Sequence, residues 1–287
     1  MKRFIALALF SASLVAQPKA KPGDVAVVQV NDRRTNGSFS QLMITLELPG
    51  IPSIDVGAMR VLVSQAVDDS GQSLLDSEAR EPELETNSRA LYAAGDKNVP
   101  LTVGVTLKNP ARKSTAVKQV TGEIELFIPS KDPNSVAEIS KFLSFSGKTL
   151  AHRALKANGV EIAQISPTQL AAEKKRLGEA KRKEYKDAGY DDETINSLVS
   201  SHLESLLNIE ESDVLVRIKD PNKRIQDLSY VDAKGETKRI SARDDEGFTI
   251  LSLWGEKPQP DWKLRVSMKT SKNIVRYPFS LSNVPLP

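Results

Sequence analysis

The stretch LMITLEL, residues 42–48, places an apolar residue at every second position. Successive side chains of a β-strand point to opposite faces, so this period of two predicts a strand with one buried face. LTVGVTLK, residues 101–108, shows the same alternation. Six further segments are predicted to be strands: residues 25–30, 59–67, 122–128, 214–218, 247–254 and 263–268.

Turn signals separate these segments. Asn36 and Gly37 can take the positive φ values of a tight hairpin turn, and residues 232–235 (DAKG) predict a second turn. Short strands without a regular βαβ alternation favour antiparallel sheets. We therefore predict a mainly β protein with two immunoglobulin-like antiparallel β-sandwich units joined by an α-helical hairpin.

The N-terminus has the layout of a secretory signal peptide. Lys2 and Arg3 precede an apolar segment, residues 4–16, and then polar residues and prolines follow. Thirteen apolar residues are too few for a membrane span, which needs roughly 20. We expect residues 1–20 to be the signal, with cleavage after Ala16 or Ala20 and export to the periplasm or the extracellular space. An uncleaved N-terminal helix is the alternative.

Composition sets further limits on function. The 287 residues include no cysteine, which excludes a disulfide, a thiol nucleophile and a lipid-bearing cysteine, so we expect a soluble mature chain without a membrane span. Loss of Lys2 and Arg3 by cleavage at Ala16 leaves 38 basic against 37 acidic residues. This balance gives no support to a nucleic-acid partner.

Two helices are predicted in the middle of the chain. SPTQ, residues 166–169, has a serine cap, a proline at the first helical position and a glutamine three residues after the cap. This helix should run to about Ala188 and end at Gly189. Asp191 or Asp192 can cap a second helix, whose apolar residues recur at helical spacing up to residue 207 and predict that it is the buried member of the pair.

The first helix is rich in basic residues. Its Lys and Arg outnumber its Asp and Glu, and the spacing allows much of the positive charge to share one exposed flank. An anionic envelope polymer or protein, or the acidic loop at residues 78–85, would suit such a flank. A solvated helix that only braces two sandwiches is the alternative. The candidate contact residues are Lys174, Lys175, Arg176, Lys181, Arg182 and Lys186.

Trp254 and Trp262 flank a proline-containing loop between two predicted strands. Such a pair could form an aromatic platform for a sugar or a peptide, and burial against a sheet is the simpler interpretation. We keep both as candidate binding residues.

Motifs for catalysis and metal binding fail on spacing. Gly147-Lys148-Thr149 lacks the glycine five residues earlier that a phosphate-binding loop requires, because that position is Phe142. The two histidines, His152 and His202, are too few for a multi-histidine metal site. Residues 66–76 (AVDDSGQSLLD) do not fit a calcium loop, and a strand followed by an Asp-x-Gly turn explains them. The glutamates of residues 76–98 match no coordination cage, and a solvated loop is the simpler interpretation. We predict no cofactor, no metal and no catalytic residue.

Several short motifs occur in the strand-rich parts of the chain: VDDSGQ and VDAKGE at Asp68 and Asp232, KNP and KDP at Lys108 and Lys219, and the ending RYPFSLSNVPLP. Together they make the chain similar to a set of exported bacterial β-sandwich proteins of immunoglobulin-like fold without an assigned activity. This resemblance implies fold and export, and it supplies no functional residue.

The sequence thus predicts an N-terminal sandwich at residues 24–166, a helical hairpin at 167–210 and a C-terminal sandwich at 211–287. We expect a non-enzymatic binding or structural protein of the cell envelope. The alternative is a hydrolase that uses carboxylates as acid and base on envelope polysaccharide or peptide, since the distance between carboxylates cannot be read from sequence.

Overall fold

The computed structural model describes residues 25–35, 40–78, 80–87, 99–205, 209–210 and 212–287. The expected signal peptide, residues 1–20, and the expected turn at Asn36 and Gly37 lie outside the described residues. The described chain is mainly β, with four antiparallel sheets. Each of the eight predicted strand segments overlaps a strand.

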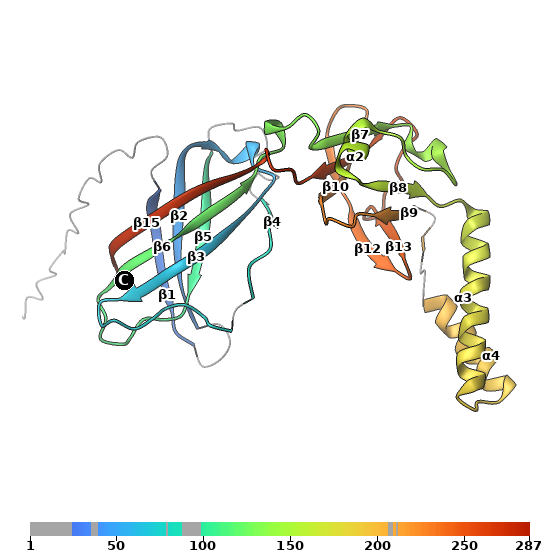
Figure 1. The fold of residues 1–287 in the computed structure, drawn as a ribbon, viewed down its shortest axis with the longest axis horizontal. Helices are drawn as coiled ribbons and strands as arrows, with labels where there is room; N and C mark the ends of the chain where they lie inside the picture. The colour runs from blue at the N-terminus through green and yellow to red at the C-terminus, as the bar shows by residue number, and fades with distance from the viewer. Residues whose placement is uncertain (1–24, 36–39, 79, 88–98, 206–208, 211) are drawn as a thin grey trace, which may run out of the picture.

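Two of the sheets share one hydrophobic core, and we call them the first sheet pair (Figure 1). One sheet has the order β1-β2-β5 and the other β15-β6-β3-β4. Their strands are β1 (Ala26–Arg33), β2 (Gln41–Pro52), β3 (Ala58–Asp68), β4 (Glu85–Thr86), β5 (Pro100–Leu107), β6 (Ala116–Phe127) and β15 (Ile274–Pro285).

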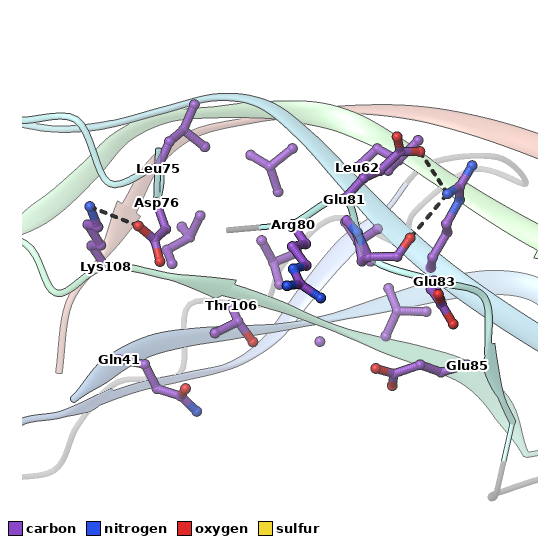
Figure 2. Close-up of a pocket in the computed structure, with 18 of the residues that line it drawn as sticks. Gln41, Leu62, Leu75, Asp76, Arg80, Glu81, Glu83, Glu85, Thr106 and Lys108 are labelled. Carbon is purple, nitrogen blue, oxygen red and sulfur yellow. Dashed lines mark hydrogen bonds and ion pairs between the residues drawn. The ribbon is translucent and has the colours of Figure 1, made fainter. Parts of the chain in front are cut away.

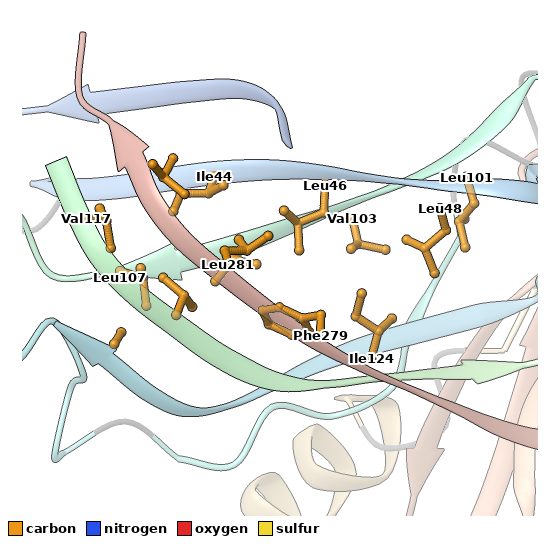
Figure 3. Close-up of a cluster of buried hydrophobic side chains, with 14 of the residues drawn as sticks. Ile44, Leu46, Leu48, Leu101, Val103, Leu107, Val117, Ile124, Phe279 and Leu281 are labelled. Carbon is orange, nitrogen blue, oxygen red and sulfur yellow. The ribbon is translucent and has the colours of Figure 1, made fainter. Parts of the chain in front are cut away.

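The alternation in β2 and β5 produces this core. Leu42, Ile44 and Leu46 are fully buried, and β5 contributes Leu101 and Val103 from the neighbouring strand. Figure 3 shows the side chains of β2 and β5, among them Ile44, Leu46 and Val103, facing those of the opposite sheet. The opposite sheet contributes Ile124 of β6 and Phe279 and Leu281 of β15. Burial of apolar side chains between the sheets stabilises the pair by roughly 1.5–3 kcal/mol for each fully buried residue.

The other two sheets form the second sheet pair, with the orders β11-β10-β14-β7 and β12-β13-β9-β8. Tyr230 lies in its core, stacked on Phe142 and close to Trp262. The strands are β7 (Val136–Ser140), β8 (Glu161–Gln164), β9 (Val214–Lys219), β10 (Ile225–Val231), β11 (Thr237–Arg239), β12 (Ser241–Asp245), β13 (Phe248–Ser252) and β14 (Lys263–Met268).

Helices fill the connections of the second sheet pair. The short helix α2 (Arg153–Asn158) precedes β8, and α3 (Pro167–Asp187) and α4 (Asp192–Ser205) lie between β8 and β9. Because β8 and β9 are neighbours in one sheet, α3 and α4 leave that sheet and return to it. Figure 1 shows this helix pair at the end of the molecule farthest from the first sheet pair.

The strand pairing groups the residues differently from the predicted division at residues 166 and 210. β7 and β8 pair with β14 and β9 of the second sheet pair, although both precede residue 166. β15, the last strand of the chain, pairs with β6 of the first sheet pair along its whole length. The two sheet pairs are therefore joined by residues 128–135 and 269–273, and not by the helices.

These two connections are bonded to each other. The backbone N–H of Ile128 donates to the carbonyl of Asn273 (2.8 Å), and that of Met268 donates to the carbonyl of Ser135 (2.7 Å). The Asn273 side chain is fully buried, donates to the Met268 carbonyl and accepts from Thr270 N–H, each at 2.8 Å. Hydrogen bonds between the two connecting segments fix the junction more firmly than a single linker would.

The repeated Asp-x-x-Gly motifs form the predicted turns. Asp68 Oδ1 accepts from the N–H groups of Ser70 and Gln72, and Gly71 has φ +87°. Asp232 Oδ1 accepts in the same way from Lys234 and Glu236. Both turns match a local pattern in which the carboxylate replaces backbone acceptors and glycine provides the positive φ.

Candidate functional site

The start of α3 is built as the sequence predicts. Ser166 Oγ accepts from the N–H of Gln169 (3.2 Å), and the Gln169 side chain accepts from the N–H of Ser166 (3.0 Å), with Pro167 at the first helical position. This capping box satisfies two backbone donors that a helix start leaves free. α3 ends at Asp187, one residue before the predicted end, and Gly189 has φ +85°.

The base of α3 is fixed to the outer face of the second sheet pair. Leu170 packs against a small cluster that includes Leu215 and Phe248. About one turn further along the helix, Glu173 forms an ion pair with Arg217 of β9 (3.1 Å), and the Arg217 guanidinium lies over the Phe248 ring. These contacts set the direction in which the helix leaves the sheet.

Beyond this base, α3 packs on α4. Gly178 is buried, and a Cβ at this position would lie 3.2 Å from Leu203 and 3.6 Å from Val199. Ile195 and Val199 of α4 are buried, whereas Leu198 is exposed. Ile195 and Val199 of α4 therefore lie on the side that faces α3. The sequence predicts that α4 is the buried member of the pair, and among the described residues of α4 only this side is buried.

The structure divides the candidate basic residues into two groups. Lys174 and Lys181 are half-buried. Lys175, Arg176, Arg182 and Lys186 are exposed, and the Lys175 side chain retains 80% of its accessible surface. Lys175 and Lys186 are three turns apart, so they project in nearly the same direction. The exposed basic flank therefore centres on these two lysines.

Ion pairs within the helices occupy several of these cations. Arg176 pairs with Glu173 (2.6 Å) and Lys181 with Glu184 (2.8 Å), and Arg182 donates to Asn196 of α4. The hydrogen bond to Glu184 raises the pKa of Lys181 above its ordinary value. Lys186 and Lys183, which are three residues apart on α3, make no ion pair with any described residue. Both are therefore available to an anionic partner.

The two tryptophans do not form a shared platform. Trp262 is 9% exposed and belongs to the second core, beside Tyr230. Trp254 is 90% exposed at the start of the loop between β13 and β14. Trp262 is therefore buried, in agreement with the simpler interpretation. Trp254 is accessible to a ligand.

The two histidines lie far apart in the sequence, one before α2 and one on α4. His152 precedes α2, and its Nδ1 accepts from the N–H of Ala154 (3.1 Å), so it caps that helix. His202 lies on α4 and is half-buried. The described residues contain no group of three or more His, Asp or Glu side chains that could hold a metal ion.

A large cavity lies in the first sheet pair, where the edge of β3 faces the edge of β5. We call it the β3–β5 groove (Figure 2). It has a volume of about 700 Å³, and its lining comes from β3, β5, the segment that begins at Leu75, and Ser40 and Gln41 at the start of β2. Figure 2 shows Arg80 projecting between the two strands, with Glu81 and Glu83 beside it.

Charged side chains surround this groove. Asp76 pairs with Lys108 of the β5 end (3.1 Å), and Arg60 pairs with Glu81 (2.8 Å) and with the buried Glu125 of β6 (2.6 Å). The hydrogen bond from Lys108 lowers the pKa of Asp76. The sequence predicts a solvated acidic loop here, and Glu81, Glu83 and Glu85 of that loop are exposed along the groove.

Two further observations concern the chain as a whole. Among the helices in the described ranges, none has both the length and the apolar character that a membrane span requires. Comparisons with protein-family models, with curated proteins and with solved structures find no match to this chain. Arguments about its function therefore rest on its own residues.

Proposed function

We propose that the chain is an exported, non-enzymatic binding or structural protein of the cell envelope, whose helix α3 contacts an anionic polymer or protein. We also propose that each sheet pair is an immunoglobulin-like sandwich with a binding surface at its outer side. Export rests on the layout of residues 1–20, in which Lys2 and Arg3 precede an apolar segment.

One observation carries this proposal: α3 extends beyond the sheets and presents exposed lysines. Lys175 and Lys186 face solvent, and Lys183 is exposed between them. The position of the helix pair also argues against a brace between the two sheet pairs, because Figure 1 places it at the far end of the second pair. The acidic segment at residues 80–85 lies on the first sheet pair, so an intramolecular contact with α3 is not made.

The test is charge reversal of the exposed flank. A Lys175→Glu, Lys183→Glu, Lys186→Glu variant leaves Lys181 and Arg182 in their contacts with Glu184 and Asn196. We expect it to stay folded and to lose retention on anionic cell-wall polymer, measured by co-sedimentation. The matched control is Lys113→Glu, Lys118→Glu, Lys234→Glu, which changes net charge equally at exposed sites away from α3.

Retention that falls equally in both variants would mean that net charge, and not α3, governs binding. Unchanged retention in the α3 variant would leave the helix as a solvated support. Exposed ion pairs contribute only about 0.2–1 kcal/mol, so charge reversal at these positions should leave the melting temperature nearly unchanged. Circular dichroism of both variants checks this expectation.

A carboxylate-dependent hydrolase is the second candidate, and the β3–β5 groove is the observation in its favour. The groove gathers four carboxylates, those of Asp76, Glu81, Glu83 and Glu85. A general acid requires a raised pKa, and the ion pair with Lys108 has the opposite effect on Asp76. Release of soluble fragments from envelope polysaccharide by the wild type, abolished in Glu83→Gln or Glu85→Gln, would favour the enzyme over the binding protein.

A further inference from the structure

The outer edge of β3 is paired only at its two ends. β4 pairs with Ala58 and Met59, and at the opposite end the N–H of Leu74 donates to the carbonyl of Ala66 (2.9 Å). Within the described part of the chain, residues 60–65 of β3 have no strand partner on this side. Backbone groups at alternate positions of such an edge can accept and donate hydrogen bonds to another strand.

The floor of the β3–β5 groove is apolar and incompletely covered. Met59, Val61, Val63 and Leu75 pack against the first core but remain partly exposed. Side chains of a strand alternate between its two faces. A strand added to β3 would therefore direct every second side chain onto this floor, and apolar residues there would cover it.

The rim of the groove has an excess of negative charge. Asp76 and Glu81 are paired with Lys108 and Arg60. Glu83 and Glu85 make no ion pair with any described residue, and one cation, Arg80, lies beside them. This balance favours an occupant that carries a basic residue over one that is neutral or acidic.

We propose that the β3–β5 groove binds an extended peptide segment of another protein, which adds as a strand to residues 60–65 of β3. The segment alternates apolar and polar residues and places a lysine or arginine near Glu83 and Glu85. Six residues of a strand span about 20 Å, which matches the unpaired length of the edge. Main-chain hydrogen bonds then supply affinity and the apolar floor supplies selectivity.

The probe is a set of synthetic heptapeptides with lysine at both ends and Thr alternating with Val, Leu or Phe between them. We expect at least one to bind the full-length protein with a dissociation constant below about 1 mM, measured by fluorescence polarisation. Binding should slow amide exchange at alternate residues between Arg60 and Gln65. The same peptide with two N-methylated amides should bind roughly tenfold more weakly or worse, because two main-chain donors are lost.

Two variants locate the site. Val61→Lys puts a charge on the apolar floor and should abolish binding, with its fold checked by circular dichroism. Glu83→Gln, Glu85→Gln should weaken the lysine peptides and leave their lysine-free versions unaffected, whereas Glu78→Gln, outside the groove lining, should change neither. The double variant keeps the proposal testable if Val61→Lys does not fold.

Three outcomes would overturn the proposal. The first is the absence of binding by every peptide of the set. The second is binding that N-methylation does not weaken, which would indicate a groove for side chains or acyl chains. The third is a dimer of the free protein in which the residue 60–65 amides are already protected and peptide does not compete, which would assign the edge to a second copy.

Discussion

Asp68 holds two loops of the first sheet pair together through one buried carboxylate. Its Oδ1 accepts from the N–H and hydroxyl of Ser70 and from Gln72, and its Oδ2 accepts from the N–H of Ala111 (2.9 Å) and the hydroxyl of Ser114 (2.8 Å). The side chain is fully buried. The sequence predicts the turn at this aspartate, but the contacts with residues 111–114 are long-range and have no local signal.

We expect Asp68→Asn to lower the free energy of unfolding by about 3 kcal/mol. The substitution replaces an acceptor oxygen by an amide donor and leaves buried donors without a partner, each of which costs about 1–3 kcal/mol. Urea denaturation at neutral pH measures the difference. Asp55→Asn, at an exposed site in the 3₁₀ turn Ser53–Asp55, is the control and should change stability little. Equal stability of both variants would contradict the role of Asp68.

The same residue predicts a pH dependence. Burial of the carboxylate opposes its ionisation, but the hydrogen bonds from Ala111, Ser70, Ser114 and Gln72 outweigh this, so the pKa of Asp68 lies well below its usual value. A lowered pKa in the folded state contributes stability above the unfolded pKa, about 3.9, and this contribution is lost as the pH falls toward the folded pKa. The stability difference between wild type and Asp68→Asn should therefore be constant from about pH 7 to about pH 5 and shrink below about pH 4. Urea denaturation over this pH series measures it, and a difference that persists at the lowest pH would argue against the assignment.

At the scale of single elements, the contact between α3 and α4 depends on the absence of a side chain at Gly178. We expect Gly178→Leu to separate the helices, because even a Cβ would approach Leu203 and Val199 closely. Amide exchange in α4 should accelerate strongly while the strands keep their protection. Ala180→Leu, at an exposed position of α3, is the matched control and should leave exchange unchanged. Equal protection of α4 in both variants would contradict the close packing.

The sequence predicts elements best where the signal is local. The alternation in β2 and β5 and the capping box at Ser166 depend on neighbouring residues, and both are confirmed. The sequence does not predict β10 or β15, because polar residues interrupt the apolar alternation of β10 and β15 contains Pro278. The sequence does not predict the β3–β5 groove for a different reason: the groove is formed by two strand edges whose pairing partners are distant in sequence.

At the scale of the whole molecule, the last strand belongs to the first sheet pair. β15 contributes Phe279, Leu281 and Val284 to the first core and pairs with β6. Hydrophobic patterning along the chain cannot reveal such a return, because pairing between residues far apart in sequence leaves no local period. The predicted division places residues 211–287 in one sandwich. It therefore implies that deletion of β15 would unfold the second sheet pair and not the first.

We expect deletion of residues 274–287 to unfold the first sheet pair and to leave the second pair structured. The deletion uncovers the β6 edge and removes three core side chains, each worth roughly 1.5–3 kcal/mol when fully buried. Amide exchange measured peptide by peptide should lose protection in β2 and β5 and retain it in β10 and β14. Loss of protection confined to β9–β14 would contradict the observed strand order.

The most direct test of the central claim, that α3 binds an anionic partner, is the salt dependence of binding. The dissociation constant of the wild-type protein for purified anionic cell-wall polymer is measured between about 0.1 M and about 1 M salt, over which the Debye length falls from about 10 Å to about 3 Å. We predict that affinity falls steeply over this range and that the Lys175→Glu, Lys183→Glu, Lys186→Glu variant shows neither the affinity nor the salt dependence. Binding that is equally strong at both salt concentrations, or equally strong in that variant, would contradict the claim.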